Sequence, residues 1–148
     1  MNNTTSKKFL ISSLGTTLVL FILNAIVFEA FLKNFFLNHP AVSPEFMKQL
    51  YRPDDQMIWW AVILSAIAIG VFVTTAVYWS GARTFASGLR SGFIFGILLL
   101  CSVDFGLYAS TNNFTLSGAF ADMLCSTFTV SLSGAVSAVL LAVKKKAS

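Results

Sequence analysis

Three acidic residues, Glu29, Asp104 and Asp122, stand within or beside long apolar stretches of the chain. A charged acid at the centre of a bilayer costs about 2.5–3.5 kcal/mol on insertion scales, and such residues usually face a protein interior or a cavity. Carboxylates in that setting bind protons or cations, or accept hydrogen bonds from neighbouring helices. Tyr108, one helical turn after Asp104, is a hydrogen-bond donor for it. The sequence therefore predicts a buried polar or ion-binding cluster of these four residues.

The motifs "CSVD" and "DMLC" mirror each other about Asn113. An antiparallel hairpin that turns at this residue sets Asp104 level with Asp122, and Cys101 level with Cys125. At about 100° per residue, each Cys also lies within roughly 60° of its Asp. Cys and carboxylate bind zinc, but D-x-x-C spacing within lipid matches no metal pattern, so no metal is expected. Free thiols are the default for small apolar Cys side chains, and a disulfide between the two stays open.

The segment after Asp122 carries four hydroxyl residues within a stripe roughly 80° wide at 100° per residue. They are Ser126, Thr129, Ser133 and Ser137. One interpretation is interhelical hydrogen bonding, worth about 0.6 kcal/mol per bond on average. The other is a proton or cation path that continues inward from the acids. Only one stripe reaches the inner half, which favours the first interpretation.

Gly88, Gly92 and Gly96 form a ladder with four-residue spacing, and Ala66, Gly70 and Thr74 form a looser ladder of small residues. Small residues let helix backbones approach closely in lipid, where the hydrophobic effect does not drive helices together. We expect these glycines to pack helices within one chain, with homo-oligomerisation as the alternative.

The composition sets the class of protein that must position these residues. The chain has 148 residues, of which 56% are hydrophobic and 11% charged, with 15 Phe. A soluble domain cannot hide that much apolar surface, so we expect an integral membrane protein. A helix needs about 20 apolar residues to span the hydrocarbon. Four such stretches, at about 9–33, 56–80, 85–110 and 117–143, make residues 1–148 a single transmembrane domain.

Short connections make neighbouring helices antiparallel, so the predicted fold is an all-α, four-helix antiparallel bundle. With four spans, both chain ends lie on one side. Seven basic residues fall on that side and three on the other, which predicts that both termini are cytoplasmic. The seven are Lys7, Lys8, Arg83, Arg90, Lys144, Lys145 and Lys146, and the three are Lys33, Lys48 and Arg52. We therefore expect a multi-pass protein of the cytoplasmic (inner) membrane.

The first outer loop contains a helix-start signal at Ser43, Pro44 and Glu45. Ser is a preferred N-cap, and Pro suits the first helical position. The following turns place apolar residues on one side, which predicts a short amphipathic helix on the outer membrane surface.

The sequence lacks the motifs that are typical of several classes of protein. His39 is the single histidine, so the chain has no bis-histidine haem ligation, and no C-x-x-C-H motif occurs. No Ser–His–Asp set, Gly-rich phosphate loop or H-E-x-x-H is present, so no catalytic residue and no cofactor are predicted. The pI of about 9.3 suits anionic lipid headgroups. No basic face interleaved with aromatic residues supports nucleic-acid binding, and the expected partner is the lipid bilayer.

The stretches "YRPDDQMIWW", "GLRSGFIFG" and "VDFGLYASTNNFTLSGAFADML" resemble small four-helix inner-membrane proteins of bacteria, common in Bacteroidota, whose function is unknown. By this resemblance Asp104, Tyr108, Asn112 and Asp122 match the polar pattern of that family. The resemblance implies the same location and topology. It implies no activity.

Two functional hypotheses follow. The first is a non-catalytic accessory or scaffold subunit that associates with itself or another membrane protein through small-residue helix faces. The second is a small proton- or cation-coupled transporter centred on Glu29, Asp104 and Asp122.

Overall fold

The computed structural model describes residues 3–143, and every regular element in that range is helical. Four helical stretches are long and apolar enough to cross a membrane, which indicates a multi-pass membrane protein. They are Thr5–Asn38, Trp59–Trp79, Phe85–Ser110 and Leu116–Ala142. The lysines at 144–146, which contribute to the predicted orientation, lie outside the described residues.

The first stretch is longer than the predicted span at 9–33. It consists of α1 (Asn3–Val27), a π-helical turn (Phe28–Leu32) and α2 (Lys33–Asn38). The helix ends at His39, with φ −130° and ψ 57°, because the α conformation is disfavoured in the residue before Pro40. The 34 residues from Thr5 to Asn38 span about 51 Å, more than the ~30 Å of hydrocarbon, so the helix must tilt or project beyond the apolar layer.

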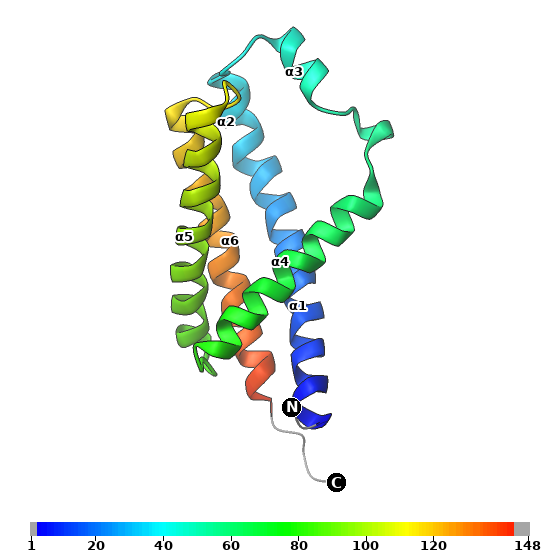
Figure 1. Cartoon of the computed structure of the whole chain (residues 1–148), viewed down its shortest axis with the longest axis vertical. Coiled ribbons are helices and arrows are strands. Elements are labelled where there is room, and N and C mark those ends of the chain that lie inside the picture. The colour runs from blue at the N-terminus through cyan, green and yellow to red at the C-terminus, as the bar shows by residue number, and fades with distance from the viewer. Residues whose placement is uncertain (1–2, 144–148) are drawn as a thin grey trace.

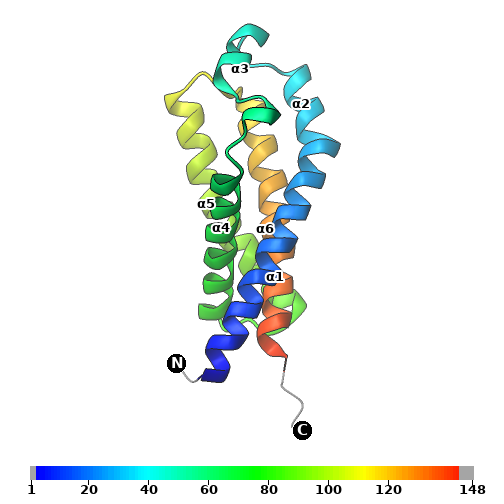
Figure 2. The ribbon, with the colours of Figure 1, turned by 90° about the vertical axis from the view of Figure 1, so that its right-hand side faces the viewer.

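The predicted short helix is present in the following connection as α3 (Pro44–Leu50). Ser43 is its N-cap, since its Oγ accepts a hydrogen bond from the Phe46 backbone N–H at 3.4 Å. Figures 1 and 2 show α3 lying beyond the ends of the long helices. A 3-10 turn (Asp54–Gln56) then leads to α4 (Trp59–Trp79).

The last two long helices form a hairpin. The first, α5 (Phe85–Ser110), has the predicted bounds, and α6 (Leu116–Ala142) differs from its prediction by one residue at each end. Thr84 begins α5 with a reciprocal capping box to Ser87, and Thr115 caps α6 through its hydroxyl. These caps fix where the two helices start.

The helix α6 is central, because it contacts α1, α4 and α5. Figure 1 shows α5 and α6 side by side and α4 crossing the other helices diagonally. We call the half of the long helices nearer the α5–α6 turn the hairpin half, uppermost in Figure 1. The opposite half, where α1 begins and α6 ends, is the terminal half.

The two halves are packed differently, and α4 shows this most clearly. The buried residues of α4 all lie in the terminal half, and no residue from Trp59 to Ile69 is buried. The core cluster occupies the same terminal half, and it comprises Leu20, Val73, Val77, Ala82, Val130, Ala138 and Leu141. In the hairpin half α4 diverges from the other helices (Figure 1). The fold is therefore closely packed in its terminal half and open along α4 in its hairpin half.

Candidate functional site

The glycine ladder of α5 packs directly against α6. A Cβ atom added to Gly92 would lie 2.8 Å from the Val130 carbonyl oxygen and 2.9 Å from Ser131 Cα. One added to Gly88 would lie 2.5 Å from Ala138 Cβ. The absence of side chains is thus what lets the two backbones touch. The ladder is used within the chain, and its face is covered by α6.

Gly70 has the same role between α4 and α1. A Cβ added there would overlap Thr17, lying 2.9 Å from its Cα and closer still to its hydroxyl. The glycine positions of both ladders are therefore covered by helices of the same chain, whereas Ala66, one turn before Gly70, is only half-buried.

The α5–α6 contacts fix the register of the hairpin. Gly88 faces Ala138, and Gly96 faces Val130. Both pairs are equidistant in sequence from Asn113, as are Asp104 and Asp122. The register continues towards the turn, where the rings of Phe105 and Phe120 pack edge to face at 4.9 Å. Asp104 and Asp122 consequently lie at the same level, each six residues, or about 9 Å, from the hairpin-end terminus of its helix.

Asp104 and Asp122 are brought close enough to interact electrostatically. Asp104 is 4% exposed, and its Oδ2 has no hydrogen-bond partner among the described residues. Asp122 is half-buried and accepts a hydrogen bond from Ser126 Oγ at 3.3 Å. Leu100, one turn before Asp104, packs against the core cluster, so Asp104 faces the interior of the fold. A buried carboxylate oxygen without a partner is costly, more so than the unpartnered hydroxyls of Ser13, Thr16 and Thr127.

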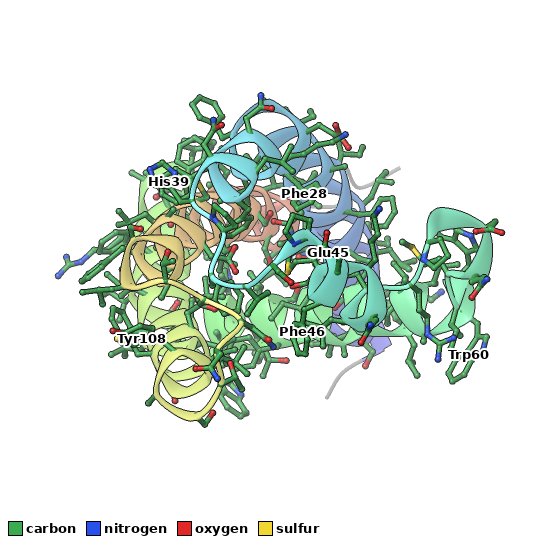
Figure 3. All side chains as sticks on the ribbon, turned by 90° about the horizontal axis from the view of Figure 1, so that it is seen from above. Phe28, His39, Glu45, Phe46, Trp60 and Tyr108 are labelled. Carbon is green, nitrogen blue, oxygen red and sulfur yellow. The ribbon has the colours of Figure 1, made fainter. Side chains whose placement is uncertain are left out.

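The structure places the other two predicted members of the cluster outside this pair. Glu29 forms an ion pair with Lys33 at 2.8 Å, and its side chain is 64% exposed. In the same helical stretch, Asn24 Oδ1 accepts the hydrogen bond of Thr129 Oγ1, although Asn24 as a whole is exposed. Glu29 lies five residues further on, within the π-helical turn, and faces outward. Tyr108 is 40% exposed and lies at the outer margin of α5 in Figure 3.

The two cysteines are free: Cys101 is exposed and Cys125 is half-buried. Cys125 lies close enough to Asp122 to interact with it electrostatically. In the part of the chain that the structure describes, no group of three or more His, Cys, Asp or Glu side chains is arranged to hold a metal ion.

The hydroxyl stripe of α6 connects this helix to its neighbours. Thr129 Oγ1 donates to Asn24 Oδ1 of α1 at 2.7 Å. Ser137 Oγ lies 3.0 Å from Ser12 Oγ of α1 and donates to Thr74 Oγ1 of α4 at 3.4 Å. Ser133 is fully buried and donates to a carbonyl oxygen of its own helix. Two of the four stripe residues, Thr129 and Ser137, therefore bond to neighbouring helices, whereas Ser126 and Ser133 bond within α6.

Sequence reasoning did not identify the buried hydroxyls of α1: Ser12 bonds to Ser137, whereas the hydroxyls of Ser13 and Thr16 have no hydrogen-bond partner among the described residues. Ser12 and Thr16 are both fully buried, and Ser13 nearly so. The spacing of Ser12 and Thr16, one helical turn apart, is the signal that places them on the same face. The structure shows that this face meets α6.

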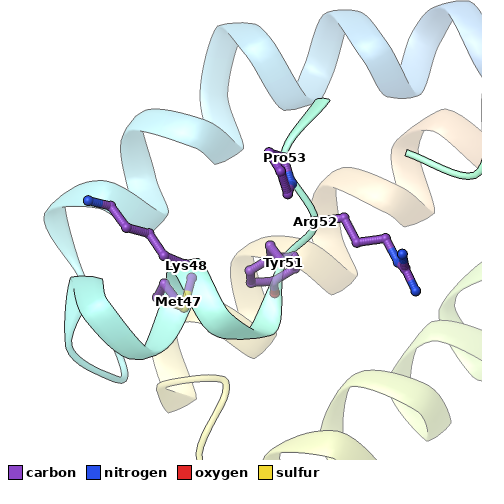
Figure 4. Close-up of a pocket in the computed structure, with 5 residues that line it drawn as sticks. All are labelled: Met47, Lys48, Tyr51, Arg52 and Pro53. Carbon is purple, nitrogen blue, oxygen red and sulfur yellow. The ribbon is translucent and has the colours of Figure 1, made fainter. Parts of the chain in front are cut away.

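One open hollow lies in the connection between α2 and α4 (Figure 4). It is lined by Met47, Lys48, Tyr51, Arg52 and Pro53. Its two cationic side chains point away from each other in Figure 4, so they do not converge on one anion.

Comparison with models of protein families, with curated proteins and with solved structures gives no match. The resemblance to small inner-membrane proteins of Bacteroidota stays a prediction.

Proposed function

We propose that the chain is a four-helix antiparallel bundle of the cytoplasmic membrane with both termini inside, and that it acts as a non-catalytic accessory or scaffold subunit. The four apolar helices support the multi-pass class. The excess of basic residues on the side of the termini, seven against three, supports the orientation. In this orientation the hairpin half lies in the outer leaflet.

The observation that carries the proposal is the open hairpin half of α4. Val62, Ala66 and Ile69 continue the buried face of α4 beyond Gly70 and Val73, yet they are only half-buried. No helix of the described chain covers them closely. A transmembrane helix of a partner protein fits this position, and it would complete the packing that α4 begins in the terminal half.

This site of association includes Ala66 of the looser small-residue ladder but not the glycine ladder of α5. The glycine ladder cannot bind a partner, because α6 already covers it. A partner helix between α4 and the hairpin instead meets the small side chain of Ala66, which permits close approach.

The test is to fill this face and measure the size of the assembly. The protein would be extracted together with its native lipids, and the mass of the particle and the co-purified chains would be determined. We expect wild type to carry a second chain and Ala66→Trp to lose it. Leu64→Trp is the matched control, because Leu64 lies two residues before Ala66 and is 57% exposed on the outward face of α4. A wild-type particle holding a single chain, or an Ala66→Trp variant that keeps its partner, would contradict the proposal.

A second candidate, a proton- or cation-coupled carrier, is favoured by one observation, the unpartnered Oδ2 of Asp104 beside Asp122. Against it, two of the hydroxyls that follow the acids along α6, those of Thr129 and Ser137, are bonded to neighbouring helices. A carrier requires that Asp104→Asn abolish a pH-dependent flux in liposomes, whereas Glu29→Gln preserves it. A flux that is indifferent to Asp104→Asn removes this candidate.

A further inference from the structure

Among residues 3–143, the structure shows no ion pair between a basic side chain and Asp104 or Asp122. Arg90 is on α5 as well, but it lies 14 residues from Asp104, about 21 Å along the helix. Buried acids are normally paired or hydrogen-bonded, because an unpaired charge in an apolar setting is costly. Asp104 Oδ2 is buried and lacks both kinds of partner.

The pair lies next to the open half of the fold. Asp122 is half-buried, as is Ser126 one turn further along α6. Asn24 of α1, whose side chain accepts the hydrogen bond of Thr129, is exposed. Polar atoms from α1 and α6 therefore border the space from which α4 diverges. Of the two acids, Asp122 is the more exposed and Asp104 the more deeply buried.

We propose that Asp104 and Asp122 form a binding site for a single basic side chain, Lys or Arg, carried by a transmembrane helix of a partner protein. The inference rests on the accessory role proposed above and gives the partner its chemistry. A charge-assisted hydrogen bond to Asp122 is roughly twice as strong as a neutral one. The carboxylate of Asp104 adds electrostatic attraction for the same basic group.

The geometry favours a cation fixed on a helix over a bound metal ion. The described residues offer only two acids here, with no third His, Cys, Asp or Glu in a metal-binding arrangement. An ammonium or guanidinium group supplies its own hydrogen-bond donors and needs only acceptors. The terminal torsion of an Asp side chain is soft, so Asp104 can turn Oδ2 toward such a group without moving α5.

The experiment uses the full chain in liposomes with a synthetic single-pass helix rich in Leu and Ala. One version of the helix has a Lys about 9 Å from its outer end, the estimated depth of the acids, and the other has norleucine there. Both carry a fluorophore, and association is measured by energy transfer to the labelled protein. We expect the Lys helix to bind about tenfold more tightly than the norleucine helix, as one charged hydrogen bond implies.

Two variants distinguish the contribution of the acid pair to binding from that of the open face of α4. The double variant Asp104→Asn, Asp122→Asn should bind both helices equally, whereas Glu29→Gln should keep the preference for Lys. Thermal unfolding of each variant reports whether the fold is retained.

Equal binding of both helices to wild type would overturn the basic-partner inference and leave the accessory role standing, because the open face still accepts a helix. A preference for Lys that survives the double variant would overturn the inference as well. If neither helix binds, both the accessory role and the basic-partner inference are contradicted, because the open face of α4 then accepts no helix. If an Asp104-dependent proton flux appears in that case, the pair belongs to a carrier.

Discussion

Gly92 of α5 and Val130 of α6 are so close that a Cβ on the glycine would lie 2.8 Å from the valine carbonyl oxygen. The atom in the way belongs to the backbone, so it cannot move aside as a side chain does. Close approach of these two helices therefore depends on glycine at this position. The same contact sets the register that carries Asp104 to the level of Asp122.

We predict that Gly92→Leu destabilises the protein by about 1–3 kcal/mol, the usual cost of overpacking. Gly106 is the matched control on the same helix, because a Cβ there meets nothing within 4 Å. Gly106→Leu should change the free energy of unfolding by less than about 0.5 kcal/mol. Unfolding in mixed micelles with increasing SDS measures both. Equal losses of unfolding free energy in the two variants would contradict the close contact between Gly92 and Val130.

The hydrogen bond between Thr129 and Asn24, at 2.7 Å, joins α6 to α1. A double-mutant cycle with Asn24→Leu and Thr129→Val should give a coupling of about 0.6 kcal/mol, the average for such bonds in membranes. Ser131 provides the comparison, since its hydroxyl donates to a carbonyl of its own helix. A cycle that pairs Ser131→Ala with Asn24→Leu should give no coupling, and a coupling equal to that of Thr129 would argue against the interhelical bond.

Glu29 and Lys33 form an exposed ion pair one turn apart. Exposed ion pairs stabilise a fold by about 0–1 kcal/mol. A pair four residues apart on one helix contributes an amount near the lower end of that range. Glu29→Gln should therefore leave the unfolding midpoint close to that of wild type at moderate ionic strength. A loss comparable to that of Gly92→Leu would instead place Glu29 inside the fold.

The sequence predicted the helices of the hairpin well, because their signals are local. Thr84 and Thr115 are caps directly before apolar stretches, and the connection between α5 and α6 is short. The end of the first stretch was less predictable. Helical hydrogen bonding continues through Lys33 past the apolar boundary, and only Pro40 stops it.

Which helix covers which face was harder to predict, because periodicity identifies a face without identifying its neighbour. The glycine spacing of α5 predicts a close contact equally well with α6 or with a second copy. Glu29 shows the same limit. The sequence places Glu29 in a long apolar stretch but does not show which way its side chain points. In the structure Asn24, and not Glu29, bonds to α6 through Thr129. A π-helical turn that includes Glu29 adds a change of helix phase, which a count of 100° per residue does not contain.

The facing positions of Asp104 and Asp122 are the central claim, and cross-linking in native membranes tests it most directly. In a background with Cys101→Ser and Cys125→Ser, the pair Asp104→Cys, Asp122→Cys would be treated with a short bifunctional thiol reagent. The control pair is Glu29→Cys, Asp122→Cys, because Glu29 lies at a similar level but faces outward. If Asp104 and Asp122 face each other, we expect rapid intramolecular cross-linking of the first pair and little cross-linking of the second. Equal rates for the two pairs, or no link between positions 104 and 122, would contradict it.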